Sequence, residues 1–275
     1  MAALYAVALP EVEVSLVDNG STDGSLEYVR RYWPQARTIC LPGNVGFAAA
    51  NNIGIRDSVA PYLITLNNDT EVEPGWLEAL LNTAEADPAI GVCASRIVLD
   101  AQPDRLDSAG ITLDRWGFAW QRGHLQPDAG AYRQACDVWG ASAAAALYRR
   151  TMLDAIGTFA EDFGSYYEDV DLAWRAQRAG WRCHYVPDRR VLHVHSATGG
   201  RDPDRKLFLL TRNRLWTMAR NYPLSRLWFM WPLLGATDLL SLTRGLIRQR
   251  NLVPLTARLA ALQGLPHVWR TRPAH

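Results

Sequence analysis

The first third of the chain alternates short apolar runs with polar turns. Three strands are expected from β-branched or alternating runs, at residues 12–17, 37–41 and 62–66. Three helices are expected between and after them, at residues 25–32, 47–59 and 74–85. This regular alternation of strand and helix predicts an α/β fold with a mostly parallel central sheet and helices on both faces.

After residue 90 the pattern is less regular. Residues 100–135 are rich in Gly, Asp and Arg and are expected to be irregular, while residues 138–148 form a small apolar run. Within that run, Gly140 to Ser142 indicate close backbone packing. Further strands are expected at residues 90–98, 181–186 and 191–195, and further helices at residues 169–179 and 203–221.

The C-terminal part divides the chain into two expected regions, a main domain over residues 1–221 and a helical extension over residues 222–275. Residues 228–247 are strongly apolar but are interrupted by Asp238 and Arg244, which leaves too short a run to cross a bilayer comfortably. Trp and Arg residues flank this run. Two interpretations remain open: an interfacial helix pair at a membrane surface, or a buried helical hairpin.

Composition narrows the classes of function. The chain has 275 residues and a net charge of +1, which does not indicate a nucleic-acid-binding surface. Its four cysteines are far apart in sequence and form no CxxC pair, so free thiols in a reducing compartment are expected. The first residues lack the basic segment of a secretory signal peptide.

The run from Tyr62 to Asp69 is the most informative stretch. A buried strand ends there in Asn67, Asn68 and Asp69, at the edge where open α/β folds bind ligands. Oxygen ligands suit Mg²⁺ or Mn²⁺, although one carboxylate is too few by itself and diphosphate oxygens and water would have to complete the shell. The alternative is a local turn at the strand end.

Two turns beside this strand are candidates for nucleotide contacts. Asp18 follows the strand at 12–17, where a carboxylate accepts a hydrogen bond from the imide N–H of uracil or thymine. Residues 43–47 form a Gly-bearing turn that opens a helix, a common place for phosphate or ribose contacts. The alternative for the Asp18 turn is a capped turn with a purely local role.

Three later segments carry further candidate chemistry. Glu168, Asp169 and Asp171 lie at a helix start, where they either complement the helix dipole or supply a general base toward a hydroxyl. His193 and His195 lie two apart on a strand and face the same side, so either supplies an imidazole to a metal. On the long helix, Arg212 either clamps a diphosphate or belongs to a solvated face.

Taken in order, these segments resemble the family 2 inverting glycosyltransferases with a GT-A fold, in particular their rhamnosyltransferase-like branch. The matching segments are residues 17–24, 44–47, 50–54, 66–70, 140–142, 168–172 and 211–215. The resemblance covers residues 10–220 in family order. Compared with the family, the first strand and its Asn-rich loop are absent, which is expected to leave the base pocket incomplete, through either a misassigned start or a truncation.

The resemblance implies a role for each matching residue. Asp18 and Asn44 would contact the nucleotide, Asp69 would ligate Mg²⁺ or Mn²⁺ beside Asn67 and Asn68, and His193 would be the additional ligand, with His195 less favoured. Asp169 matches the catalytic base. Arg212 would stabilise the leaving diphosphate, and Glu168, Trp139 and Gly140 would lie on the acceptor side.

The resemblance therefore implies an enzyme that transfers a sugar from a dTDP- or UDP-sugar to a glycan or polyprenyl-linked acceptor in cell-wall polysaccharide synthesis. Peripheral contact with the inner face of the plasma membrane is expected. The alternative is a non-catalytic, membrane-associated partner or relic. A sugar nucleotidyltransferase is disfavoured because no Gly-rich N-terminal loop with Arg and Lys would bind a triphosphate.

Overall fold

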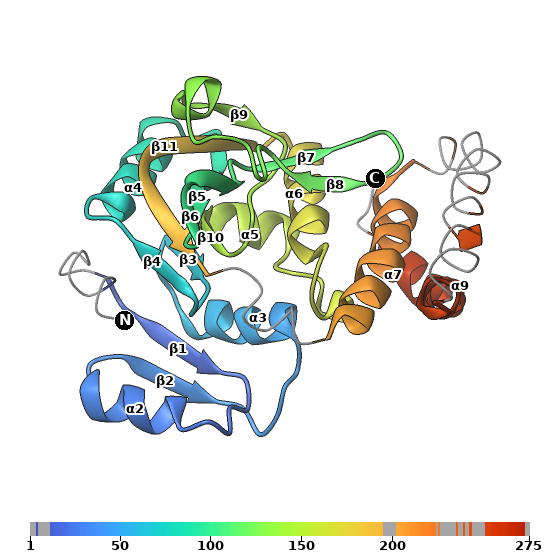
Figure 1. Cartoon of the computed structure of the whole chain (residues 1–275), viewed down its shortest axis with the longest axis horizontal. Coiled ribbons are helices and arrows are strands. Elements are labelled where there is room, and N and C mark those ends of the chain that lie inside the picture. Colours follow the sequence, from blue (N-terminus) through green and yellow to red (C-terminus); the bar gives the residue numbers. More distant parts are fainter. Residues whose placement is uncertain are drawn as a thin grey trace. The chain divides into compact units, whose positions relative to one another are not determined.

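The structure is a computed structural model that describes residues 12–194, 202–223 and 251–272, with isolated positions in between (Figure 1). The chain folds into two compact units. The first takes the chain up to residue 112 and residues 120–195, and the second takes residues 113–119 and the chain from residue 196 onward. His195 and the apolar run 228–247 lie outside the described residues, apart from isolated positions within the run.

A seven-stranded mixed sheet, counted over the described residues, forms the core of the first unit. Five strands follow the order β3-β10-β5-β11-β4, with β6 added beside β5 and β9 beside β11. Their bounds are β3 Tyr62–Leu66, β4 Thr70–Val72, β5 Ile90–Leu99, β6 Gln102–Ser108, β9 Cys136–Val138, β10 Ala145–Arg149 and β11 Arg182–His193.

The α/β fold class is confirmed, but the expectation of a mostly parallel sheet is wrong. Of the pairings in the seven-stranded sheet, only β5 with β11 is parallel. Strand β10 lies antiparallel between β3 and β5, and β4, β6 and β9 are also antiparallel to their neighbours. Parallel pairs need crossover connections, and the irregular segments around β9 and β10 allow the chain to return in the opposite direction instead.

The first two strands form a separate parallel pair. Strand β1 (Ser15–Asp18) pairs with β2 (Arg37–Cys40), joined through helix α2 (Ser25–Tyr32). Helix α3 (Phe47–Asp57) follows and contacts β1. This βαβ unit matches the sequence prediction in order and direction.

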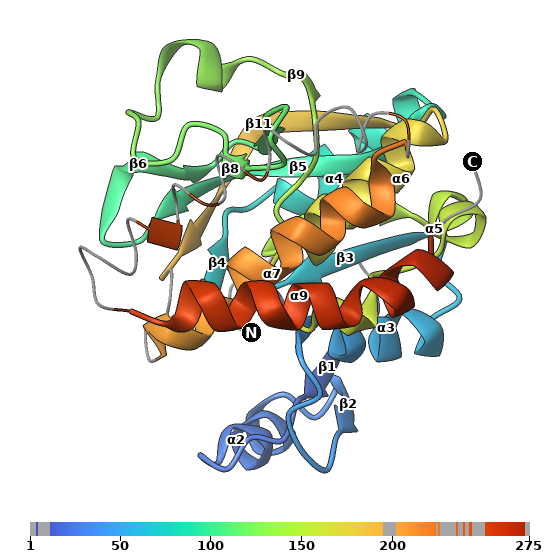
Figure 2. The same ribbon diagram turned by 90° about the vertical axis from the view of Figure 1, so that its right-hand side faces the viewer.

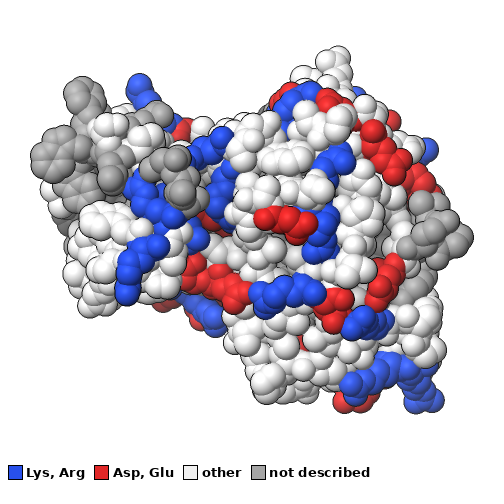
Figure 3. All heavy atoms as spheres, turned by 180° about the vertical axis from the view of Figure 1, so that it is seen from behind, with Lys and Arg blue, Asp and Glu red and all other residues white. Residues whose placement is uncertain are grey.

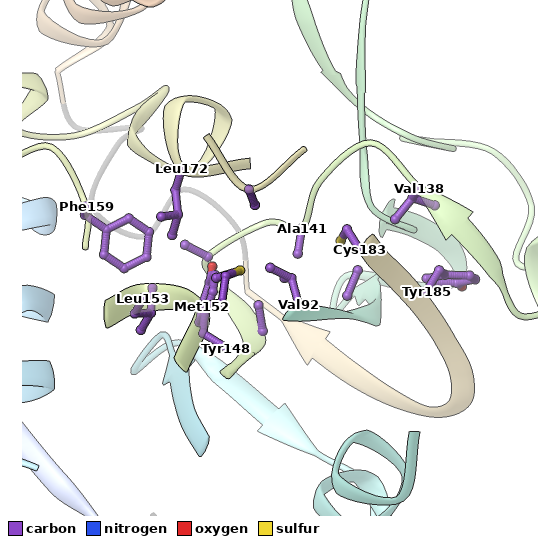
Figure 4. Close-up of a cluster of buried hydrophobic side chains, with 14 of the residues drawn as sticks. Val92, Val138, Ala141, Tyr148, Met152, Leu153, Phe159, Leu172, Cys183 and Tyr185 are labelled. Atoms are coloured by element: carbon purple, nitrogen blue, oxygen red, sulfur yellow. The ribbon is translucent and has the colours of Figure 1, made fainter. Parts of the chain in front are cut away.

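Helices cover both faces of the large sheet, as expected. Helix α4 (Trp76–Ala86) packs its buried side chains against one face. Helices α5 (Arg150–Ile156) and α6 (Glu168–Arg178) pack on the other face, where Met152 and Leu172 meet Val92 and Tyr148 (Figure 4). Successive side chains of β5 pack into the hydrophobic clusters on the two faces of the sheet, because side chains alternate across a strand. Val92 packs on the face covered by α5 and α6, and Cys93 packs on the face covered by α4.

The segment 100–135 contains more regular structure than its sequence predicts. It forms β6 and the hairpin of β7 (Ile111–Leu113) with β8 (Ala119–Gln121), so the expectation of an irregular segment is wrong. Likewise, the two strands expected at 181–186 and 191–195 are one strand, β11, with a register shift between Val186 and Arg190. A bulge of this kind bends a strand without ending it.

The second unit contains two long helices that lie side by side (Figure 2). They are α7 (Pro203–Asn221) and α9 (Val253–Arg270). The Trp216 indole N–H donates to the carbonyl of Ala261 at 3.0 Å, and Arg272 donates to the carbonyl of Tyr222, which ties the two helices together. Among the helices that the structure describes, none is long and apolar enough to cross a membrane.

Charged side chains of both signs are interspersed on the face shown in Figure 3. This mixture agrees with the net charge of +1. A nucleic-acid-binding face would instead gather Lys and Arg into a continuous patch.

Candidate active site

The candidate metal-site residues Asn67, Asn68 and Asp69 lie in the turn that follows β3. Asn67 is partly buried and its N–H donates to the carbonyl of Ala144 at 2.8 Å. The Thr70 hydroxyl donates to the carbonyl of Asn67 at 2.5 Å and opens β4. Asn68 is exposed, and Asp69 is partly buried between the two strands. The turn therefore holds Asp69 at the carboxyl end of β3.

His193 faces Asp69 directly. It lies at the end of β11, opposite Thr70 of β4, and its Nε2 is 3.3 Å from Asp69 Oδ1. The Val194 N–H also donates to the carbonyl of Asp69 at 3.0 Å. The antiparallel pair of β4 and β11 therefore brings together two candidate ligands that are 124 positions apart in sequence.

A second carboxylate, Asp107 of β6, lies on the other side of the His193 ring. His193 Nδ1 is 2.7 Å from Asp107 Oδ2, and both side chains are buried. Burial alone would lower the pKa of His193, but its hydrogen bonds to Asp107 and Asp69 and their negative charges raise that pKa to about 9. The sequence pattern gives no sign of Asp107 as a site residue, because Asp107 lies in the segment that was expected to be irregular.

The donor set fits a divalent cation. One carboxylate oxygen from Asp69 and one imidazole nitrogen from His193 suit Mg²⁺ or Mn²⁺ once the competing cation displaces the Nε2 proton of His193, and the hydrogen bond from Nδ1 to Asp107 leaves Nε2 directed at Asp69. Within the described residues, no group of three or more His, Cys, Asp or Glu is arranged to hold a metal. Oxygens from a ligand would therefore have to complete the coordination shell.

Asp169 lies in the first turn of α6 and is held by two backbone groups. Val170 N–H donates to Oδ1 at 2.8 Å, and Ala143 N–H approaches Oδ2 at 3.4 Å. Burial raises the pKa of Asp169 to about 6 against these stabilising contacts. A carboxylate with such a pKa is ionised at neutral pH but basic enough to accept a proton.

The backbone just before Asp169 is strained. Tyr166 and Tyr167 both have φ of 69°, in the left-handed region that residues with a side chain rarely adopt. Such residues persist where surrounding packing holds them, and they gather at functional sites. Tyr167 is the residue that precedes α6, so this conformation sets the direction in which Glu168 and Asp169 leave the turn.

The two acidic neighbours of Asp169, Glu168 and Asp171, differ from it in burial and in hydrogen-bond partners. Glu168 is buried, and burial together with the nearby Asp169 charge raises its pKa well above the usual value. Asp171 is fully buried and bonds Arg175 Nε at 2.9 Å. Arg175 also donates to the carbonyls of residues 156–158. Asp171 is therefore part of a buried ion pair that ties α6 to the segment after α5.

The turn after Trp139 connects Asp169 to the turn that carries Asn67 and Asp69. A Cβ on Gly140 would lie 2.7 Å from Ala173 Cβ, so only glycine allows this approach to α6. Trp139 packs edge-on against Trp174 with ring centroids 5.5 Å apart. Ala143 then contacts Asp169 and Ala144 accepts from Asn67. The expectation of close backbone packing at this turn is confirmed.

Asp18 lies in a second pair of turns. It is buried, and its Oδ1 accepts from Ser21 N–H at 3.1 Å, which is the local turn contact that its sequence also allows. Asn19 Nδ2 donates to Asn44 Oδ1 at 3.2 Å and joins the two turns. Gly20 has φ of +80°, and a Cβ there would lie 2.6 Å from Gly43 Cα. The structure therefore brings Asp18 and Asn44 into one loop pair.

This loop pair contacts the segment that leads to α6. Ala48 N–H donates to the carbonyl of Gly164 at 2.9 Å, and Phe47 N–H donates to Ser165 Oγ at 3.3 Å. Asn52 exchanges hydrogen bonds with the backbone of Phe159 and is buried, so it serves packing. The Asp18 turn, the start of α3 and the approach to Asp169 therefore form one connected network.

Arg212 lies on α7 in the second unit. Its Nε donates to Asn213 Oδ1 at 2.8 Å, and its guanidinium carbon is 4.2 Å from the centre of the Trp216 ring. Its expected contact with a diphosphate stays a prediction.

A mixed α/β sheet with Asp69 and His193 at its carboxyl edge, a helix-borne carboxylate at Asp169 and two joined turns at Asn19 and Asn44 are the arrangement expected of a GT-A glycosyltransferase. Comparisons with known proteins agree with this class. The sequence model described as Glycosyl transferase family 2 matches residues 2–157. The chain belongs to this family and is a glycosyltransferase.

A relative in Mycobacterium tuberculosis, an N-acetylglucosaminyl-diphospho-decaprenol L-rhamnosyltransferase, is 31% identical over 253 residues. The match covers 80% of this chain and 81% of the relative. The O-antigen biosynthesis protein RfbC of Myxococcus xanthus is 27% identical, covering 69% of this chain and 15% of that protein. These matches support a rhamnosyltransferase-like member of the family.

Two solved structures share the fold. GalNAc-T7 with UDP, GalNAc and Mn²⁺ matches with a TM-score of 0.61 at 16% identity, covering 79% of this chain and 44% of that chain. The mannosyltransferase PcManGT from Pyrobaculum calidifontis, in complex with GDP-Man and Mn²⁺, matches with a TM-score of 0.55 at 17% identity. That match covers 97% of this chain and 70% of the mannosyltransferase. The GT-A fold is thereby confirmed.

Proposed function

We propose that this glycosyltransferase moves L-rhamnose from a dTDP- or UDP-linked donor to a hydroxyl of a polyprenyl-linked glycan, with inversion at the anomeric carbon. The single observation that carries the proposal is the turn 143–144, which touches Asp169 on one side and the Asn67 edge on the other. The name of the Mycobacterium tuberculosis relative supports both the sugar and the lipid-linked acceptor. We further propose that this reaction serves cell-wall polysaccharide synthesis at the inner face of the plasma membrane.

In this proposal Asp169 is the catalytic base. Its pKa of about 6 leaves it ionised at neutral pH, so it accepts the proton of the acceptor hydroxyl. The acceptor oxygen forms its bond to the anomeric carbon while the bond from that carbon to the diphosphate oxygen breaks. One displacement from the opposite face inverts the configuration and needs no covalent enzyme intermediate. Glu168 precedes this base, Gly140 lies against Ala173 of the same helix and Trp139 against Trp174, and these three residues are proposed to line the acceptor side.

The donor is proposed to bind along the loop pair and the strand edge. Asp18 would accept from the imide N–H of the base, and Asn44 lies beside it. Asp69 and His193 would hold Mg²⁺ or Mn²⁺, which when bound supplies positive charge to the leaving diphosphate. The Mn²⁺ in the two solved structures supports a divalent cation. Arg212 is proposed as a second contact to the diphosphate.

The test is to replace Asp169 with Asn and to measure transfer and binding separately. We expect transfer to fall by a factor of about 10² to 10⁴, the usual contribution of a general base, while calorimetry with Mn²⁺ still detects binding of the dTDP- or UDP-sugar. Asp154→Asn, at an exposed position of α5, is the matched control and should keep full activity. Full transfer by Asp169→Asn would contradict the assignment. Absence of any donor binding by the unmodified protein would favour a non-catalytic partner.

A further inference from the structure

The contact of Asp107 with His193 spans two strands. Strand β5 lies between β6 and β11, so the backbones of β6 and β11 are about 9.5 Å apart, twice the usual strand spacing. Asp107 Oδ2 nevertheless reaches His193 Nδ1 at 2.7 Å. A short carboxylate side chain does not cover this distance from a regular strand position without help from the backbone.

A β-bulge supplies that help. Ile97 of β5 pairs with Ser108 and the next residue, Val98, pairs with Leu106, which leaves Asp107 as the extra residue of β6. Bulges bend a strand and redirect a side chain, and they gather next to active sites. Here the extra residue is the one whose carboxylate meets His193.

His124 holds Asp107 from the far side. Its Nδ1 is 3.2 Å from Asp107 Oδ1 and also 3.2 Å from the Asp107 carbonyl oxygen. His124 lies in the turn after β8, and its neighbour Leu125 donates to the carbonyl of Leu106 at 2.8 Å. The loop after β8 therefore fixes the backbone of the bulge, and His124 lies next to its carboxylate.

We propose that Asp107 is a positioning residue of the metal site, which fixes the His193 ring so that Nε2 faces Asp69, and that His124 fixes Asp107 in turn. The strand pair β4–β11 holds the backbones of Thr70 and His193 opposite each other, but this pairing does not itself set the rotation of the imidazole. A hydrogen bond from Nδ1 to a buried carboxylate does set it. This inference rests on the proposed function, because it assumes that Asp69 and His193 hold a divalent cation.

The experiment measures Mn²⁺ affinity in the presence of UDP or dTDP by electron paramagnetic resonance. Asp107→Asn should raise the Mn²⁺ dissociation constant about 10- to 100-fold, the usual effect of losing a partner of a ligating histidine. His124→Gln should raise it less. Asp104→Asn, an exposed position on the same strand, is the control and should stay within twofold of the unmodified protein. Since Asp107 touches no reacting atom, saturating Mn²⁺ should restore kcat in Asp107→Asn.

A second readout needs no variant. In the metal-free protein, the Nδ1 proton of His193 should give a downfield, slowly exchanging NMR signal, because it is buried between the ring and Asp107. A rapidly exchanging Nδ1 proton would overturn the proposal, even where Asp107→Asn fails to fold. If the unmodified protein binds Mn²⁺ with UDP or dTDP but folded Asp107→Asn binds it equally well, the inference alone is wrong. If the unmodified protein binds no Mn²⁺, the proposed metal site is wrong and the role of Asp107 with it.

Discussion

Replacing Asp169 with Asn should stabilise the protein while it removes activity. Burial raises the pKa of Asp169 from its ordinary value of 3.8 to about 6. The folded state therefore resists ionisation of this carboxyl, whereas the unfolded chain ionises it from about pH 4. The stability that the neutral carboxyl provides is fully present below pH 4 and is lost as the pH rises to about 6. Above that pH the ionised carboxylate lowers the free energy of unfolding by a constant amount.

The magnitude follows from the pKa. At ~1.4 kcal/mol for each pH unit, the difference between 3.8 and about 6 amounts to about 3 kcal/mol. Asn cannot accept at both positions, so one of the hydrogen bonds from Val170 or Ala143 is lost at about 1 kcal/mol. The net gain at pH 7.5 is about 2 kcal/mol, which corresponds to a rise in Tm of about 4–8 °C.

Differential scanning calorimetry of the unmodified protein and Asp169→Asn between pH 3.5 and 8 measures this gain. The two proteins should be nearly equal in stability at the acidic end and should diverge as the pH passes through the window from 4 to 6. Asp154→Asn, exposed on α5, should show no such divergence. If Asp169→Asn is less stable than the unmodified protein at pH 7.5, the ionised carboxylate is stabilised by its surroundings and the expected gain in stability is wrong.

Three further outcomes are expected. Asp171→Asn should lower the free energy of unfolding by about 3–5 kcal/mol, measured by urea titration, because it leaves the buried Arg175 unpaired; an unchanged midpoint would contradict this. Gly20→Ala should weaken binding of UDP or dTDP in calorimetry, because its Cβ would lie 2.6 Å from Gly43 Cα, whereas Gly24→Ala, with a similar φ and open space, should not share that clash. In a pH series, kcat/KM should rise as Asp169 ionises, with an apparent pKa of about 6; a flat profile from pH 5 to 8 would exclude Asp169 as the base.

Local patterns predicted the first third of the fold well. The helix at Ser25–Tyr32 and the strand at Tyr62–Leu66 lie where their sequences place them, because each has its own turn signals and apolar spacing. Strand β6 was missed for the opposite reason. Its first three residues, Gln102 to Asp104, are exposed, and its strand structure comes from pairing with β5. Such pairing depends on residues that are close in space and that no local window contains.

The candidate site likewise divides into residues that local sequence patterns predict and residues whose roles depend on distant parts of the chain. The short motifs around Asp18, Asp69 and Asp169 could be found because each follows a strand or opens a helix. The roles of their neighbours could not be found in this way, since the ion pair of Asp171 with Arg175 appears only once the structure shows both side chains buried. Asp107 had no signal beyond a single acidic residue in a polar segment. Its role depends on a bulge and on two other strands.

A single displacement with Asp169 as base has to invert the anomeric configuration of the transferred sugar. It is tested most directly by ¹H NMR of the product formed from dTDP-L-rhamnose of known anomeric configuration, a polyprenyl-linked N-acetylglucosamine acceptor and Mn²⁺. We expect a new glycosidic bond whose anomeric configuration is opposite to that of the donor. A product with the donor's configuration would contradict it, because retention requires a different mechanism from the one that a single base supports.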